Sequence, residues 1–167
     1  MEARRPSPGG GGRFAQSGGL ERKAVVALNV FLDSSALAKR YMEEPGSDRL
    51  EEILASASAL GVSVVCVTEV ISALARRRRE RKLLPQQYLK AKQALFEDIE
   101  EASVINLTDQ VVARAVALLE RWPLRSSDSL HVASAAEWSA DLLVSADDRQ
   151  CRAARGYGLR VEQLPVG

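Results

Sequence analysis

The stretch "AVVALNVFLD", residues 24–33, is a nearly unbroken apolar run that ends in an aspartate. Apolar residues on both faces of a short run are typical of a central strand in a parallel sheet, which helices cover on both sides. The residues that follow, "SSALAKRYMEE", predict a helix over 34–44. This strand and helix begin the alternation on which the fold prediction rests.

The rest of the chain repeats the alternation of short apolar runs and helical patterns. Pro45, Gly46 and Ser47 predict the start of a second helix. After Gly61, "VSVVCV" predicts a second strand, and Thr68 and Thr108 are expected to cap the helices that follow them. The further strands are expected at 62–67, 103–107, 141–146 and 159–164, and the further helices at 47–58, 69–82, 86–102, 109–122, 124–140 and 147–158.

This order of elements predicts an α/β fold: a three-layer α/β/α sandwich with a five-stranded, mostly parallel central sheet. Polar residues alternate in the strand at 159–164, which is therefore expected at an edge of the sheet. The chain of 167 residues is long enough for one domain, which we expect at 27–165. Residues 1–26 are rich in Pro, Gly, Ser and Arg and predict a disordered extension or a vector-derived remnant.

The composition restricts the classes of function. The formal net charge is +1, so attraction to nucleic acid must come from a local patch. Cys66 and Cys151 fit no zinc-binding spacing, and Cys66 is expected to be buried in a reducing compartment, which points to the cytoplasm. No apolar run approaches the ~18 residues that a membrane span requires.

Acidic residues recur where the predicted strands end. Asp33 ends the first strand, Glu69 lies two residues beyond the second, and Asp147 ends the fourth. Ligands of open parallel sheets bind beyond the carboxyl ends of the strands, so these acids are expected at one edge. Asp128 opens the helix before the fourth strand and joins them if that helix begins at the same edge.

A divalent cation would relieve the repulsion among carboxylates that share a site. Hard oxygen ligands suit Mg²⁺ or Mn²⁺, which activate water in nucleases. Each acid also has a simpler interpretation, because aspartate and glutamate are favoured as caps or first-turn residues of helices. Their recurrence at one edge favours the shared site.

The run "RRRRERK", residues 76–82, is the strongest local charge in the chain. One interpretation is a solvated surface near the end of a helix, where cations are favoured. The other is a rim that grips RNA phosphates, with Arg76, Arg77 and Arg79 from this run and Arg149 from a later motif.

Four segments together resemble the PIN-domain ribonucleases, and above all the VapC-type toxins of toxin–antitoxin systems. They are "NVFLDSSALAKRY", "VTEVISAL", "LRSSDSLHVASAAE" and "LLVSADDRQ", within a match that runs from about Ala27 to Leu164. The resemblance implies a magnesium-dependent endoribonuclease that hydrolyses RNA phosphodiester bonds with metal-activated water. It implies that four acids bind the cation, Mg²⁺ or Mn²⁺, and are catalytic: Asp33, Glu69, Asp128 and Asp147. It also implies that Ser35 and Ser145 place hydroxyls near the cation and that Asp148 is an accessory acid.

The resemblance also implies partners: an RNA substrate, a cognate antitoxin protein and a second copy of the chain in a homodimer. His131 is the only histidine, which excludes a metal-free mechanism with two histidines in one chain. We interpret His131 as a helix-surface or packing residue. Two alternatives stay open: an aspartate-nucleophile phosphatase, although position 35 holds Ser where such enzymes have a second Asp, and a non-catalytic PIN-fold module that binds RNA or protein.

Overall fold

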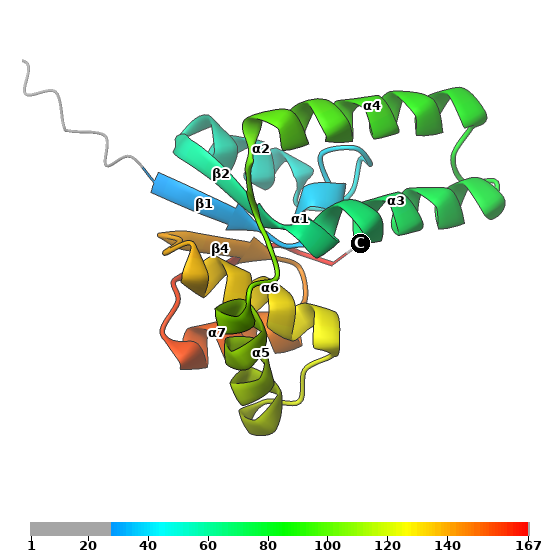
Figure 1. The fold of residues 1–167 in the computed structure, drawn as a ribbon. Coiled ribbons are helices and arrows are strands. Elements are labelled where there is room, and N and C mark those ends of the chain that lie inside the picture. The colour runs from blue at the N-terminus through cyan, green and yellow to red at the C-terminus, as the bar shows by residue number, and fades with distance from the viewer. Residues whose placement is uncertain (1–27, 167) are drawn as a thin grey trace, which may run out of the picture.

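The computed structural model describes residues 28–166 and shows a five-stranded sheet between two layers of helices (Figure 1). The strand order is β3-β2-β1-β4-β5, and all four neighbouring pairs run parallel. The predicted α/β sandwich is confirmed, and the sheet is wholly rather than mostly parallel. The strands are β1 (Leu28–Leu32), β2 (Ala57–Ser63), β3 (Ser103–Ile105), β4 (Leu142–Ser145) and β5 (Val161–Gln163). The helices of the described chain are α1 (Ser34–Ala38), α2 (Ser47–Ala55), α3 (Val64–Arg79), α4 (Pro85–Glu101), α5 (Asp109–Arg121), α6 (Ser126–Glu137) and α7 (Asp148–Tyr157).

The central strand β1 places its side chains alternately on the two faces of the sheet. Val30 and Leu32 pack in the core shared with α1–α4, whereas Phe31 packs in the core shared with α5–α7. All three side chains are fully buried. Because a parallel strand is covered on both faces, an apolar residue is favoured at every position, and this explains the unbroken run.

The second strand lies earlier in the chain than predicted. The run at 62–67 was expected to form it, but β2 spans Ala57–Ser63, and Val64 already begins α3. Ser63, with an extended backbone, is the residue at which the strand ends and the helix starts. The prediction is wrong because a short apolar run does not by its periodicity distinguish a strand from a buried helix.

The same shift changes the place of Thr68, which was wrongly expected to cap the helix. Thr68 lies inside α3, and its hydroxyl donates to the carbonyl oxygen of Val65 at 2.9 Å. The buried stripe of α3 is formed by Cys66, Val70 and Leu74, which are spaced four residues apart. Glu69 therefore lies in the second turn of this helix, not at its start.

The other predicted elements are confirmed within the described residues, with boundaries moved by up to six residues. Residues 24–27 of the first predicted strand lie outside that range. The helix expected at 34–44 ends as α1 at Ala38, because the chain then turns. The Ser47 hydroxyl holds this turn by donating to the carbonyl oxygen of Lys39 at 2.9 Å and accepting from the Glu44 amide at 3.2 Å. Thr108 caps α5 as predicted, its hydroxyl accepting from the Val111 amide.

Several predictions concern the limits of the chain. The predicted tail, residues 1–26, lies outside the described residues, and the domain limits 27 and 165 stay predictions. Cys66 and Cys151 are buried and unpaired, as expected for Cys66. None of the helices within 28–166 has the length and the apolar character that crossing a bilayer requires.

Gly61 lies inside β2 because a tryptophan ring packs directly against its Cα. A Cβ atom at this position would lie 2.6 Å from Cε3 of Trp138, at the end of α6. We expect Gly61→Ala to lower the free energy of unfolding by about 1–3 kcal/mol, the usual cost of overpacking a core. Urea denaturation measures the loss, and adding Trp138→Leu should recover part of it. Equal stability of Gly61→Ala and the wild type would contradict this packing.

Candidate active site

A pocket of about 500 Å³ lies at the carboxyl ends of β1 and β4. The strand order reverses between these neighbours, since β2 and β3 lie on one side of β1 while β4 and β5 lie on the other (Figure 1). Such a switch point is where open α/β sheets bind ligands. Asp33, which follows β1, and Asp147, which follows β4, line the pocket together with Glu69 of α3 and Asp128 of α6.

Asp33 is buried, with 3% of its surface exposed, and both of its carboxylate oxygens are hydrogen-bonded. Oδ1 accepts from the amide of Ala36 at 2.8 Å, so Asp33 caps α1. Oδ2 accepts from the Ser145 hydroxyl at 2.7 Å and from Nε2 of Gln150 at 3.0 Å. The Ser35 hydroxyl donates to the same carboxylate. A buried carboxylate needs such donors to compensate for lost hydration.

The two serines predicted near the acids also join the ends of β1 and β4. The Ser35 hydroxyl accepts from the amide of Ala146 at 2.9 Å, and the Ser145 hydroxyl accepts from the amide of Asp147 at 3.0 Å. Each serine thus contacts Asp33 with its proton and the chain after β4 with its oxygen. The position of Asp147 relative to Asp33 follows from these bonds.

Asp147 caps α7, Asp128 completes the capping box of α6 from the third position of that helix, and both line the pocket as well. Oδ2 of Asp128 accepts from the amide of Arg125 at 3.1 Å, and Oδ1 of Asp147 accepts from the amide of Gln150 at 2.9 Å. Each bond uses one oxygen of the carboxylate. The capping interpretation and the shared pocket are therefore both correct for these residues.

Burial raises the pKa of Asp128, and the nearby charge of Asp147 raises it further, while the hydrogen bond from the Arg125 amide opposes the shift. The two carboxylates are therefore close enough to repel each other. Like charges that share a site in this way are common where a protein binds a cation or a reacting group.

Glu69 is held by two side chains that sequence reasoning did not assign to the site. Its Oε2 accepts from the Ser34 hydroxyl and lies 2.7 Å from Nε2 of His131. Burial by itself would raise the pKa of Glu69, but the hydrogen bonds from His131 and Ser34 lower it to about 2. Glu69 is therefore ionised at neutral pH.

His131 is buried, as the interpretation as a packing residue requires, but it also lines the pocket. It has 2% of its surface exposed and lies one turn beyond Asp128 on α6. That spacing places both side chains on one face of the helix, and it is the signal that could have assigned His131 to the site. Ser34 and Gln150 were also missed. Ser34 adjoins Asp33, and Gln150 follows Asp147 by one helical turn.

Lys39 is a further unexpected member of the pocket wall. It is 3% exposed, and its Nζ lies 3.4 Å from Oε2 of Glu44. Glu44 is shared with Arg77, which pairs with its other oxygen. Two cations with one carboxylate leave an excess of positive charge beside the four acids. No sequence signal identified Lys39, because a lysine at a helix end is usually solvated.

The remaining predicted residues divide between the pocket and the outer surface. Arg76 and Arg77 line the pocket, whereas Arg79 is exposed and outside its wall. Nη2 of Arg149 lies 4.0 Å from Oδ2 of Asp147. Asp148 is exposed and pairs with Arg152, and it does not line the pocket.

Comparison with known protein families identifies a family that accounts for most of this chain. The family model of the PIN domain matches residues 30–156, a range that includes all four acids. The chain belongs to the PIN-domain family. The predicted resemblance to this family is thereby confirmed.

The relatives of this PIN domain include toxins of toxin–antitoxin systems. Ribonuclease VapC46 of Mycobacterium tuberculosis is 32% identical over 134 residues, which cover 79% of this chain and 95% of VapC46. The structure of VapC20 of Mycobacterium tuberculosis, a toxin that cleaves the sarcin–ricin loop, has a TM-score of 0.61 at 18% identity and covers 81% of this chain and 99% of VapC20. The structure of DNA-bound VapBC from Salmonella typhimurium has a TM-score of 0.60 at 18% identity and covers 81% of this chain and 98% of the matched VapBC chain. The PIN domain is thus a distant homologue of the VapC ribonuclease toxins.

The four acids of the PIN domain match a hard divalent cation in their donor chemistry. Carboxylate oxygens are the ligands that Mg²⁺ and Mn²⁺ prefer. Within residues 28–166, however, no three His, Cys, Asp or Glu side chains stand close enough together to hold an ion. Asp128 and Asp147 are instead bonded to amides of their own helices, and Glu69 to Ser34 and His131.

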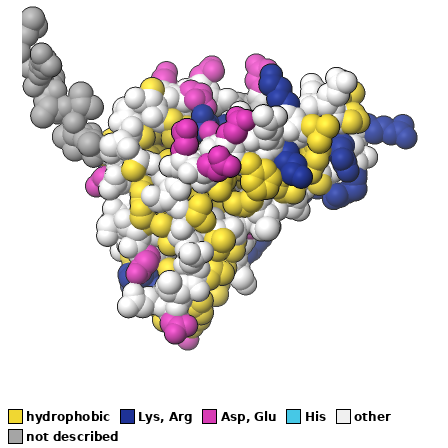
Figure 2. Space-filling model, turned by 45° about the horizontal axis from the view of Figure 1, so that its top comes forward, with side chains coloured by type: hydrophobic (Ala, Val, Ile, Leu, Met, Phe, Trp, Pro, Cys, Tyr) yellow, Lys and Arg dark blue, Asp and Glu magenta, His cyan; other side chains and the backbone are white. Residues whose placement is uncertain are grey.

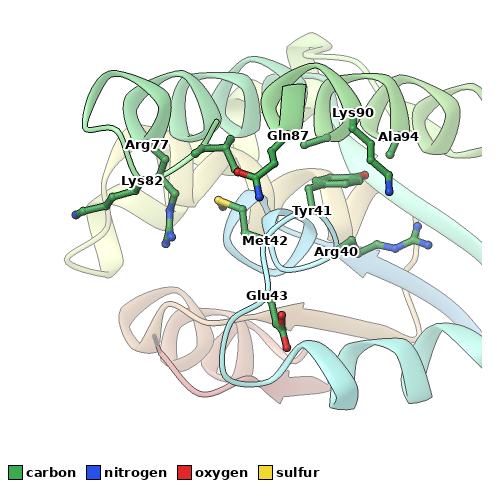
Figure 3. Close-up of a pocket in the computed structure, with 11 residues that line it drawn as sticks. Arg40, Tyr41, Met42, Glu43, Arg77, Lys82, Gln87, Lys90 and Ala94 are labelled. Carbon is green, nitrogen blue, oxygen red and sulfur yellow. The ribbon is translucent and has the colours of Figure 1, made fainter. Parts of the chain in front are cut away.

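A second pocket of about 460 Å³ adjoins the first, and Met42 and Arg77 line both (Figure 3). It lies between residues 40–43 and the hairpin of α3 and α4, and its wall includes Arg40, Lys82 and Lys90. Figure 2 shows Lys and Arg side chains gathered toward the end of this hairpin. The rim beyond the acids is therefore mostly basic, which favours a polyanionic ligand.

The raised pKa of Asp128 predicts a stability effect at neutral pH. The ionised carboxylate is less favourable in the folded chain than in the unfolded one, so stability falls as the pH rises from the unfolded pKa through the folded one. Asp128→Asn removes this cost and keeps an acceptor for the Arg125 amide. We expect the variant to be more stable than the wild type at pH 7 in EDTA and equally stable near pH 3, where both side chains are neutral.

Urea denaturation at both pH values measures this difference. Asp109→Asn is a matched control, because Asp109 is also a first-turn acid but lies on α5, away from the pocket. The helix dipole favours an acid there, so this variant should be no more stable than the wild type. A loss of stability at pH 7 in Asp128→Asn would contradict the electrostatic interpretation.

Proposed function

We propose that this PIN-domain protein is a magnesium-dependent endoribonuclease and the toxin of a type II toxin–antitoxin pair. The observation that carries the proposal is the convergence of Asp33, Glu69, Asp128 and Asp147, from four separate segments, on one pocket. The 32% identity to ribonuclease VapC46 supports the same activity. RNA is the proposed substrate, and Mg²⁺ or Mn²⁺ the proposed cofactor.

The four acids would hold the cation, which supplies Lewis-acid activation of water and stabilises charge on the phosphate. Asp33 is the most rigid of them, because four donors fix its carboxylate. Glu69, with its pKa lowered to about 2, supplies a permanent negative charge. Lys39 and Arg77 also line the pocket and would attract the phosphate of the substrate.

The sequence disfavours the phosphatase alternative, because position 35 holds Ser where such enzymes have a second Asp. In the structure the Ser35 hydroxyl donates to Asp33 and supplies no second carboxylate. The second alternative, a non-catalytic module that binds RNA or protein, shares the basic rim and is distinguished by the experiment below.

The partners and the location are part of the proposal. A toxin–antitoxin complex from Klebsiella pneumoniae is among the solved structures that this fold resembles, and we propose a cognate antitoxin for this chain as well. The exposed stripe of Val112, Val116 and Leu119 on α5 offers an apolar surface for a homodimer. Two unpaired buried cysteines agree with a reducing cytoplasm.

Asp147→Asn tests the activity with the fold preserved, because asparagine also caps a helix. We expect cleavage of single-stranded RNA in Mg²⁺ to fall by about 100-fold or more, which corresponds to the loss of a few kcal/mol of charge stabilisation. The matched control is Asp148→Asn, since Asp148 begins the same helix but lies outside the pocket. The control should cleave like the wild type.

The same assay tests the cofactor. EDTA should stop cleavage by the wild type, and Mg²⁺ or Mn²⁺ should restore it. Cleavage that persists in EDTA, or equal activity of Asp147→Asn and Asp148→Asn, would reject the proposed mechanism. RNA binding without any cleavage in either cation would favour the non-catalytic module.

The arginine run yields a prediction of its own. Arg76 lines the acidic pocket, whereas Arg79, one turn further along α3, does not. We expect Arg76→Glu to weaken the binding of single-stranded RNA and to reduce the slope of log K against log salt concentration by about 1, because one phosphate contact is lost. Fluorescence anisotropy in EDTA measures binding without cleavage. An equal effect of Arg79→Glu would show that only the overall charge matters.

A further inference from the structure

Glu69 of α3 is held by side chains from two other helices. Ser34 of α1 donates its hydroxyl proton to Oε2 of Glu69, and Nε2 of His131 on α6 lies 2.7 Å from the same oxygen. Nε2 of His131 also lies 3.0 Å from the Ser34 hydroxyl oxygen. The three side chains thus form a closed triangle of contacts within the pocket wall.

The protons in this triangle can be assigned from its geometry. Because the Ser34 proton is used toward Glu69, the Ser34 oxygen faces Nε2 of His131 as an acceptor. Nε2 therefore carries a hydrogen and donates toward both oxygens. A Ser-His-Glu hydrolase would need the serine and the carboxylate on different nitrogens of the ring, so this triangle is not a catalytic triad.

The other ring nitrogen of His131 points to a reason for its presence beyond packing. Nδ1 is buried and has no hydrogen-bond partner among the described residues. A buried polar atom without a partner costs stability that an apolar side chain of similar size would avoid. The flanking positions of α6, Val132 and Ala133, are apolar and fully buried. The contact from Nε2 to Glu69 is what a leucine at this position could not supply.

Both contacts fall on one oxygen of Glu69, Oε2, and they fix the carboxylate while about a third of the side chain remains exposed. Hydrogen bonds to the far side of a ligating carboxylate are how proteins orient metal ligands. We propose that Ser34 and His131 are positioning residues that orient Glu69 for the binding of a divalent cation. This inference rests on the proposed function, since it assumes that the acids bind a cation.

Calorimetric titration with Mn²⁺ alone, without RNA, tests the inference. We expect His131→Leu to weaken Mn²⁺ binding about 10- to 100-fold, the usual effect of losing a partner of a metal ligand. His131→Gln, whose amide can donate to Oε2, should recover most of the affinity. Thermal unfolding in EDTA supplies a second readout: the Tm of His131→Leu should fall by no more than ~4 °C, because removal of the unpaired Nδ1 partly offsets the lost hydrogen bond to Glu69.

Ser134→Ala is the matched control. Ser134 lies one turn further along α6 and is buried, and its side-chain oxygen also has no partner within residues 28–166, but it is not part of the pocket wall. This variant should bind Mn²⁺ like the wild type. In RNA cleavage, His131→Leu should need about 10- to 100-fold more Mg²⁺ for its half-maximal rate, with kcat largely recovered at saturating Mg²⁺.

Three results would overturn the inference. The first is wild-type Mn²⁺ affinity in His131→Leu while the wild type binds Mn²⁺ and cleaves RNA, which would leave the proposed function intact. The second is a large fall in Tm together with weak Mn²⁺ binding that His131→Gln does not recover, which would assign His131 a structural role. The third is a wild type that binds no Mn²⁺ at all, which would reject the proposed function and this inference with it.

Discussion

Four hydrogen-bond donors surround the buried carboxylate of Asp33, and they come from α1, β4 and α7. A carboxylate that has lost its water must find such donors inside the protein, so the folded chain has to bring these elements together at the end of β1. Once Ser145 and Gln150 are in place, the position of Asp147 follows from the bonds of its own amide and of α7. The geometry of the pocket therefore depends on the satisfaction of one buried charge.

The acids of the pocket have a structural and a chemical role at the same time. Asp33 and Asp147 each cap a helix with one oxygen, Asp128 completes the capping box of α6 with one oxygen, and all three line the same pocket. For Asp128 and Asp147 the two roles are compatible, because the bond to the helix uses only one oxygen of each carboxylate. Helix starts that gather at the switch point of a parallel sheet thus supply both the caps and the acidic site.

The pocket contains buried polar and charged groups that are not fully compensated, unlike the apolar core. Asp128 and Asp147 repel each other, Lys39 is a buried ammonium that shares its only carboxylate with Arg77, and Nδ1 of His131 has no partner in the described chain. Each of these features costs stability, and they are concentrated in one pocket. Such a concentration is expected where a site is selected for binding and reaction, and it agrees with the membership of the PIN-domain family.

The sequence by itself determined the class of fold, the central strand that Asp33 follows and the cap at Thr108, because each of these depends on local periodicity or on a residue's place at the end of an element. It also predicted that the four acids gather at one edge, although Glu69 reaches the pocket from the second turn of α3 and not from a strand end. It did not determine where β2 ends and α3 begins, since "VSVVCV" suits a buried strand and a buried helix equally, and only the packing of Cys66, Val70 and Leu74 in the core decides between them. Nor did it determine that Lys39 and His131 face the acids. Their burial depends on partners far along the chain, Glu69 for His131 and the shared Glu44–Arg77 pair for Lys39, and contacts of that kind exist only after the helices have packed on the sheet.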